Sequence, residues 1–429
     1  MMEVVIEKLV HGGQGLGTLE DGRKVFVWGA LPGEKVMVRI LKGKRSYAEA
    51  IAEEVIEPSP LRIPPREDNY LATSPWQILQ FDAENDYKKR IVEELFTQAH
   101  VSLPEFVMTT AGDDWHYRNK MEYSFWGDDD GLHLALHNRG SHHKTIVRGS
   151  QLALSAVDAA ARAVTAELQK QQVRAGDLKT IIVRCNQAGE AVASLFVKPE
   201  SFIELQKPPE LTGLRVYHSN PKSPASVPTK LLYEVGEGHM HDQLLGRTFT
   251  YDADSFFQVN VPIFEQALLR IKQHFADAGE TVDMYAGTGS IGLSIVNSSP
   301  DKNAQNEAGQ KVDLVELDPA TAAMARINVD NSDVNAEVIE ASSEKSLDYI
   351  TADKPVIFDP PRAGLHDKLV AHTLEVHPPR IAYLSCNPAT HARDLAKLQE
   401  DYSITYFEAF NFFPHTPHIE TLAILERKG

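Results

Sequence analysis

Apolar and polar residues alternate in short runs through the first part of the chain. Examples are Lys35 to Ile40 and Tyr47 to Ile56, and glycine-rich turns such as His11 to Gly17 separate the runs. Alternation with a period of two is typical of strands that bury one face. We therefore expect a small closed β-barrel over residues 1–57.

Prolines between Pro58 and Pro65 end this pattern, because proline has no amide hydrogen for a strand ladder. The stretch predicts a linker. Residues 66–240 then combine a charged helical pattern, Phe81 to Ala99, with strand-like runs such as Thr180 to Cys185. This mixture predicts a central α+β domain.

The last part of the chain, residues 241–429, has a different rhythm. After about residue 260, strand-like runs alternate with helical patterns, and the runs end near Tyr285, Glu316, Ile339, Phe358 and Ser385. This order predicts an α/β domain with a parallel, doubly wound sheet, whose ligands gather at the carboxyl ends of the strands. The polar segment Asn297 to Lys311 is predicted to be a mobile loop between the first helix and the second strand.

Length and composition favour a soluble multidomain protein. The chain has 429 residues, 42% of them hydrophobic, which is enough for two or three cores. It contains no apolar run of 18 residues and no apolar leader, so we expect a cytoplasmic protein without a membrane partner. No segment looks like an obligate coiled coil or an exposed apolar interface, so we expect a monomer. The two cysteines, Cys185 and Cys386, cannot form a disulfide framework or a four-cysteine metal site within one chain.

The net charge of −17 argues against a generally basic nucleic-acid surface. The first 47 residues have the opposite sign, with eight Lys and Arg against five Asp and Glu. They include the cluster Lys42, Lys44 and Arg45. An RNA site would therefore be local, although a short basic cluster is more often only a solvated surface.

A glycine turn follows the first strand of the C-terminal domain. Gly287, Gly289 and Gly292 have the G-x-G-x-x-G spacing, and Glu316 ends the next strand, where a carboxylate can accept hydrogen bonds from ribose hydroxyls. The pattern fits a nicotinamide dinucleotide or S-adenosylmethionine equally well. The glycines could also serve only to pack a helix on a strand.

Two later motifs favour a methyltransferase. Asp359-Pro360-Pro361 resembles the D-P-P signature of enzymes that methylate nucleobases, and its prolines would hold Asp359 rigidly at a strand end. Cys386 lies where the fifth strand meets a helix, and we expect the positive end of that helix to lower its thiol pKa. Cys185 lies within a strand-like run and is predicted to be buried and inert.

The C-terminal segment supplies a carboxylate. Glu420 follows His415 and His418 in a turn interrupted by prolines, ahead of a last strand-like run. The three side chains could be taken for a metal site, but their spacing on a broken turn makes a single carboxylate base the better interpretation.

Taken together, the ordered motifs closely resemble the RNA uracil-5 methyltransferase family, which makes 5-methyluridine. Residues 1–57 look like a TRAM domain, a barrel related to the oligonucleotide-binding fold, so the resemblance covers nearly the whole chain. The motifs are Phe256 to Asn260, Tyr285 to Gly292, Asp359 to Gly364, Ser385 to Thr390 and Phe413 to Glu420.

The resemblance implies a class I S-adenosylmethionine-dependent methyltransferase domain and a role for each matching residue. Cys386 would be the nucleophile and Glu420 the proton acceptor. The RNA partner would be a transfer or a ribosomal RNA, which the sequence does not distinguish. The residues implied in binding S-adenosylmethionine are Gln258, Tyr285, Gly287, Gly289, Ser290, Glu316 and Asp359, and Ser290 stands where many relatives have asparagine.

The sequence departs from the family in two further places. Many relatives carry cysteines for a four-iron, four-sulfur cluster in the stretch that here runs from Ile63 to Gln77, which has none. Such a cluster needs thiolate ligands, so we expect no cluster. Near Ser342, where relatives often place an acidic or amide residue for adenine, only serines are available, which leaves the adenine contacts open.

The implied chemistry explains the residue types. Uracil C5 is a weak nucleophile, and addition of a thiolate to C6 activates it; a base must then remove the C5 proton. The target base would be flipped out of the helix, onto aromatic side chains near Phe256 and Phe257. The alternatives are an RNA-binding protein with an inactive domain, a non-covalent methyltransferase acting on an exocyclic nitrogen or a protein, and a nicotinamide oxidoreductase.

Overall fold

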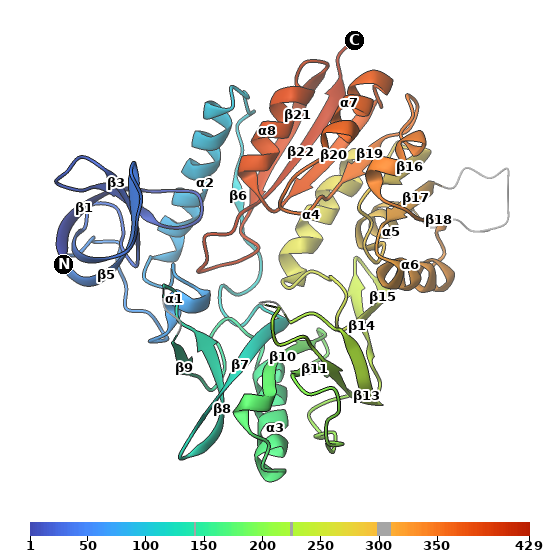
Figure 1. Cartoon of the computed structure of the whole chain (residues 1–429). Helices are drawn as coiled ribbons and strands as arrows, with labels where there is room; N and C mark the ends of the chain where they lie inside the picture. The colour runs from blue at the N-terminus through green and yellow to red at the C-terminus, as the bar shows by residue number, and fades with distance from the viewer. Residues whose placement is uncertain (141–142, 224–225, 298–309) are drawn as a thin grey trace.

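The computed structural model describes residues 1–140, 143–223, 226–297 and 310–429. Most of the predicted loop from Asn297 to Lys311 lies outside these ranges. The chain forms a barrel at the N-terminus, a seven-stranded sheet and an eight-stranded sheet that carries the C-terminus. In Figure 1 the barrel is blue, the seven-stranded sheet is mostly green, and the eight-stranded sheet is mostly orange to red, with the cyan strand β6 joined to it. The predicted N-terminal barrel and doubly wound α/β sheet are confirmed.

Five strands close the barrel in the order β1-β2-β3-β5-β4. Their inward side chains, which include Val25, Val27, Val36 and Val38, are almost fully buried, as the period-two pattern requires. The strands are β1 Met2–Leu9, β2 Gly15–Thr18, β3 Lys24–Trp28, β4 Lys35–Gly43 and β5 Tyr47–Glu57.

The segment after the barrel joins the C-terminal part of the molecule. Helix α1 (Tyr70–Thr73) is short. Helix α2 (Phe81–Gln98) packs on α8 (Pro388–Leu398), and strand β6 (Met108–Thr109) pairs with β21 (Tyr402–Phe410). Ile91, Val92 and Phe96 of α2 belong to the same buried cluster as the strands of the eight-stranded sheet. Part of the predicted central range, residues 66–240, therefore packs with the C-terminal sheet.

The seven-stranded sheet has the order β13-β12-β11-β10-β7-β8-β9 and is covered on one face by helix α3 (Ser155–Lys170). Its buried cluster includes Cys185, which is 0% exposed. The strands are β7 Lys120–Asp128, β8 Gly131–His137, β9 Lys144–Ile146, β10 Leu178–Cys185, β11 Ala191–Val197, β12 Gly213–His218 and β13 Lys230–Gly236.

The eight-stranded sheet has the order β18-β17-β16-β19-β20-β22-β21-β6. The strands from β18 to β20 run parallel, whereas β22 is antiparallel to both neighbours. The strands are β16 Glu280–Asp283, β17 Lys311–Glu316, β18 Asn335–Glu340, β19 Val356–Phe358, β20 Arg380–Ser385, β21 Tyr402–Phe410 and β22 Glu420–Arg427.

A buried cluster lies on each face of this sheet, because successive side chains of a strand point to opposite faces. One cluster joins the sheet to α2, α7 and α8, and the other joins it to α4, α5 and a hairpin of β14 and β15. These elements are β14 His239–Leu244, β15 Arg247–Asp252, α4 Val261–His274, α5 Ser290–Ile295, α6 Pro319–Asn331, α7 Asp367–Val376 and α8 Pro388–Leu398. No helix within the described ranges is long and apolar enough to cross a membrane.

Candidate active site

Cys386 and Glu420 meet at the edge of the sheet where the parallel strands end. Cys386 directly follows β20, and Glu420 begins the antiparallel strand β22. Ser385 pairs with Thr421 in the register of these strands, so Cys386 and Glu420 occupy the next, facing positions. The structure therefore places the predicted nucleophile beside the predicted base, although 34 positions separate them in the sequence.

Burial and neighbouring negative charge raise the pKa values of the acidic groups of this site. Burial raises the pKa of the Cys386 thiol to about 12, and the carboxylates of Glu420 and Asp359 add to the effect. Burial, followed by repulsion from Asp359, raises the pKa of Glu420 well above its usual value. The expectation that the helix would lower the pKa of Cys386 is therefore wrong for the free protein, because desolvation outweighs the helix terminus.

This shift predicts how Cys386 reacts with iodoacetamide. Only the thiolate is alkylated, so in the free protein the rate should rise about tenfold per pH unit from about pH 7.5 to about pH 9.5. Mass spectrometry of the peptide that contains Cys386 measures this rate. A rate that levels off near neutral pH would contradict the raised pKa, and the buried Cys185 should stay unmodified while the protein is folded.

Three loops are tied together around Cys386. The Asn387 amide donates to the backbone oxygen of Arg362 (2.9 Å), and Arg362 Nη2 lies 3.4 Å from His418 Nδ1. His11, from a turn of the N-terminal barrel, is hydrogen-bonded to the Asn387 side chain. The barrel therefore contacts the residue that follows Cys386.

Sequence reasoning did not identify His11 or Arg362 as site residues, and it considered His418 only as a metal ligand. Burial, assisted by the nearby Arg362 guanidinium, lowers the pKa of His418 to about 4, so this imidazole is neutral at pH 7. Arg362 opposes the negative charges by favouring the ionised forms of Cys386 and Glu420. The position of Arg362 inside the Asp-Pro-Pro-Arg motif was the only available signal in the sequence.

The glycine turn has both of the roles that the sequence suggested, because one glycine leaves room for a ligand and another packs the helix on the strand. Gly287 has a φ of 57°, and a Cβ added there would meet no atom within 4 Å, so its backbone borders open space. A Cβ at Gly292 would lie 2.5 Å from Leu314, so this glycine packs the helix on the strand. Gly289, with a φ of 83°, caps α5 just before Ser290. The turn brings a bare stretch of backbone to the strand edge.

Polar groups surround this turn. Glu316 accepts hydrogen bonds from the backbone amides of Gly287 (2.9 Å) and Asp318 (2.8 Å), and is half-buried at the end of β17. Burial, followed by repulsion from Asp283, raises the pKa of Asp359 to about 7. The hydroxyl of Thr288 is buried, and the described residues give it no hydrogen-bond partner. Such a group is expected to bind a ligand or water.

The other predicted residues lie around the same edge. The Tyr285 hydroxyl is hydrogen-bonded to Ser343, which follows the buried Ser342 after β18. Gln258 is 7% exposed, and its backbone oxygen accepts a hydrogen bond from Asn119 (2.9 Å). These contacts leave the roles of Tyr285, Ser342 and Gln258 as predictions.

One of the two aromatic candidates for stacking on a flipped base is excluded. Phe257 is 2% exposed and stacks on Tyr251 with ring centroids 4.1 Å apart. Its face is therefore occupied within the core. Phe256 is 67% exposed and stays available.

The metal interpretation of the C-terminal motif finds no support among the described residues, which include no group of three or more His, Cys, Asp or Glu placed to hold an ion. His415 Nε2 lies 3.2 Å from Asp114 Oδ2, whereas His418 Nδ1 lies beside Arg362 Nη2, so the two imidazoles have different partners. An iron–sulfur cluster does not fit either, because the stretch from Ile63 to Gln77 has no thiolate.

Comparison with known proteins gives consistent matches over the whole length. Residues 226–428 match the family described as tRNA (Uracil-5-)-methyltransferase, and residues 1–52 match the TRAM domain. An uncharacterized RNA methyltransferase of Lactiplantibacillus plantarum is 30% identical over 100% of this chain and 97% of its own. One from Enterococcus faecalis is 29% identical, with the same coverage.

A solved structure has the same fold. It is the tRNA (uracil-54, C5)-methyltransferase of Pyrococcus abyssi in complex with S-adenosyl-L-homocysteine. The TM-score is 0.79 with 23% sequence identity, and the match covers 99% of this chain and 100% of the other.

Proposed function

The chain belongs to the RNA (uracil-5-)-methyltransferase family, and on this premise we propose that it converts a uridine of RNA to 5-methyluridine through a covalent bond between Cys386 and uracil C6. Glu420 removes the C5 proton in this proposal. The observation that supports it best is the strand register, in which positions 386 and 420 face each other at the edge where the parallel strands end and where sheets of this kind usually bind ligands.

The residues at this edge fit S-adenosylmethionine, the methyl donor of the family. Glu316 has lone pairs left for ribose hydroxyls, and Gly287 leaves space for a ligand beside the backbone. The neighbouring Thr288 hydroxyl is buried and has no hydrogen-bond partner among the described residues. When bound, S-adenosylmethionine supplies an electrophilic methyl group. Tyr285, Asp359 and the other predicted residues complete the proposed binding site.

The chain's own groups then carry the proton and bond changes on uracil. The Cys386 thiol loses its proton to solvent, the thiolate adds to C6, and the negative charge moves onto the ring and makes C5 nucleophilic. After C5 is methylated, Glu420 takes its proton, the C5–C6 double bond forms again and the sulfur leaves. Burial raises the pKa of Glu420, which makes its carboxylate a stronger base for this carbon-bound proton.

Arg362 supports both groups electrostatically. Its guanidinium favours the thiolate of Cys386 and the carboxylate of Glu420, the two forms that the reaction needs. His418 stays neutral beside it and adds no competing charge. The loops of Asp359, Cys386 and Glu420 thus act as one site.

RNA is the proposed partner of a single chain, with the barrel of residues 1–57 as an RNA-binding element. The first 47 residues of the barrel carry eight Lys and Arg against five Asp and Glu in a chain of net charge −17, and His11 brings the barrel next to the site. RNA bound to the barrel would therefore lie close to Cys386. The central and C-terminal parts, residues 66–240 and 241–429, complete the proposed domain organisation.

We expect the purified protein to form 5-methyluridine from S-adenosylmethionine and one class of RNA. The test incubates it separately with transfer RNA and ribosomal RNA that lack 5-methyluridine, followed by nucleoside mass spectrometry. Methylation of one RNA identifies the substrate class. Absence of 5-methyluridine from both, or a methyl group on another atom, would overturn the proposal.

A further inference from the structure

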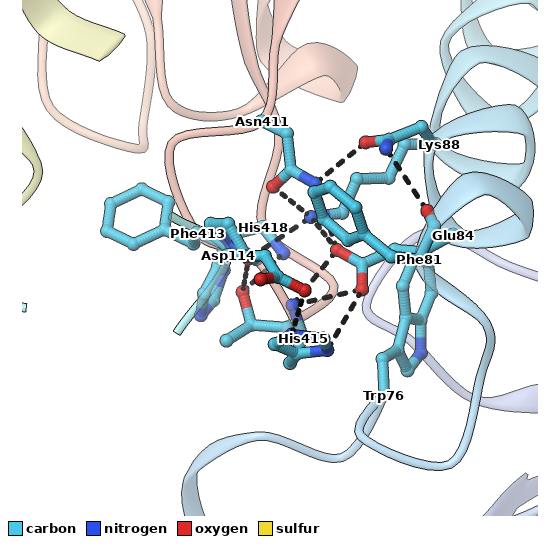
Figure 2. A network of polar contacts seen from close by, with 12 residues as sticks. Trp76, Phe81, Glu84, Lys88, Asp114, Asn411, Phe413, His415 and His418 are labelled. Atoms are coloured by element: carbon cyan, nitrogen blue, oxygen red, sulfur yellow. Dashed lines mark hydrogen bonds and ion pairs between the residues drawn. The ribbon is translucent and has the colours of Figure 1, made fainter. Parts of the chain in front are cut away.

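A buried ion pair on helix α2 holds the loop that leads into Glu420. Glu84 and Lys88 are both 0% exposed, and Lys88 Nζ lies 2.8 Å from Glu84 Oε1. Figure 2 shows that both side chains point from the helix toward Asn411 and His415 of this loop, which we call the base loop, residues 411–418. The pair comes from a part of the chain more than 300 residues away.

Both members of the pair bind the backbone of the base loop. Lys88 donates to the Asn411 side-chain oxygen (2.7 Å) and to the Phe413 backbone oxygen (3.1 Å). The backbone amide of His415 donates to both oxygens of Glu84, at 3.0 Å each. The Asn411 amide also donates to Glu84 (3.0 Å). The loop thus depends on α2 for hydrogen bonds that a buried backbone must make.

The base loop is held in a conformation that it would not adopt freely. His415 has a φ of 62°, in the left-handed region that non-glycine residues avoid, and is 2% exposed. Its ring stacks on the Trp115 ring with centroids 3.8 Å apart. Its backbone oxygen accepts a hydrogen bond from the Trp76 backbone amide (3.1 Å). Such a conformation persists only where the surroundings fix it.

The constraint extends from His415 to the proposed base. The Thr416 hydroxyl donates to the Phe413 backbone oxygen (2.7 Å), and the His418 amide donates to the Thr416 hydroxyl oxygen (3.3 Å). Ile419 is then buried, and Glu420 starts β22. Hydrogen bonds within the base loop therefore connect Phe413, whose backbone oxygen binds Lys88, to the start of β22 at Glu420.

We propose that Glu84 and Lys88 are positioning residues, which fix the base loop so that Glu420 reaches the C5 proton of uracil. A buried ion pair is a poor source of net stability, because desolvation of two charges offsets their attraction. The bonds from this pair to the base loop instead give that loop a single geometry. This inference rests on the proposed function of Glu420.

The test replaces both charges at once, because Lys88→Met alone would leave the Glu84 carboxylate buried without a cation. In Glu84→Leu/Lys88→Met, we expect turnover to fall between about 10- and 100-fold, as for a misplaced catalytic group. Cys386 should still add to uracil, so a covalent RNA–protein adduct accumulates on a denaturing gel. The affinity for S-adenosylmethionine should change less than about twofold, because the hydrogen bonds of Glu84 and Lys88 among the described residues go to the base loop and not to the glycine turn. Asn411→Ala keeps the ion pair and should shift turnover and adduct in the same direction.

The matched control is a second ion pair with a buried carboxylate, whose hydrogen bonds among the described residues do not reach the base loop. Glu34 is 0% exposed and binds Arg62 near the barrel. Glu34→Leu/Arg62→Met should leave the ratio of adduct to released product unchanged. The proposal would be overturned if adduct formation and turnover fell together in Glu84→Leu/Lys88→Met. It would also be overturned if turnover in that variant stayed at the wild-type value. If the proposed function itself fails, the wild-type protein run in parallel makes no 5-methyluridine.

Discussion

Replacing Cys386 by alanine should lower the rate of uridine methylation at least about 10³-fold, because the variant loses the group that activates uracil C5. No other cysteine can take its place, since Cys185 lies buried in β10. Nucleoside mass spectrometry under single-turnover conditions measures the loss. A denaturing gel should show no RNA–protein adduct, while calorimetry should show that S-adenosylmethionine still binds.

Cys185→Ala is the matched control for this result. It removes the second thiol of the chain from the core of the seven-stranded sheet, at a stability cost of about 1 kcal/mol for the lost contacts. Its methylation rate should equal that of the wild type. If Cys386→Ala retained the wild-type rate, the covalent mechanism would be wrong, and methyl transfer without a protein nucleophile would take its place.

The fold was predictable because its signals are local. Alternation marked the barrel, and strand-like runs that end at Glu316, Phe358 and Ser385 marked the parallel sheet. In a parallel sheet, neighbouring strands end at one edge, so the predicted site residues could be expected to converge there. The antiparallel strand β22, which begins at Glu420, brings this residue to that same edge.

The electrostatics of the site were not predictable in the same way. The helix after Cys386 is visible in the sequence and suggested a low thiol pKa, but the burial and the carboxylates that raise it come from separate segments. The contact of His11 with Asn387 joins residues 376 positions apart. Likewise, nothing around Lys88 in the sequence of α2 distinguishes it from a solvated lysine on a charged helix. Such long-range contacts follow only from the assembled fold.

Glu420→Gln should stop the reaction after the covalent bond has formed. Glutamine keeps the size of the side chain but cannot accept the C5 proton, so the sulfur of Cys386 stays bound to C6 of the methylated base. We expect turnover to fall between about 10² and 10⁴-fold, and a covalent RNA–protein adduct to accumulate. A denaturing gel and mass spectrometry of the RNA-linked peptide containing Cys386 measure the two effects.

The control is Glu408→Gln on the adjoining strand β21, where Glu408 is 2% exposed and binds Arg270 (3.0 Å) outside the site. Both variants remove a buried carboxylate, but only the one at residue 420 should trap the adduct. Release of 5-methyluridine at the wild-type rate by Glu420→Gln would assign the proton to another base. Because the Asp359 carboxylate also faces this site and has its pKa raised to about 7, Asp359→Asn would then be the next variant to test.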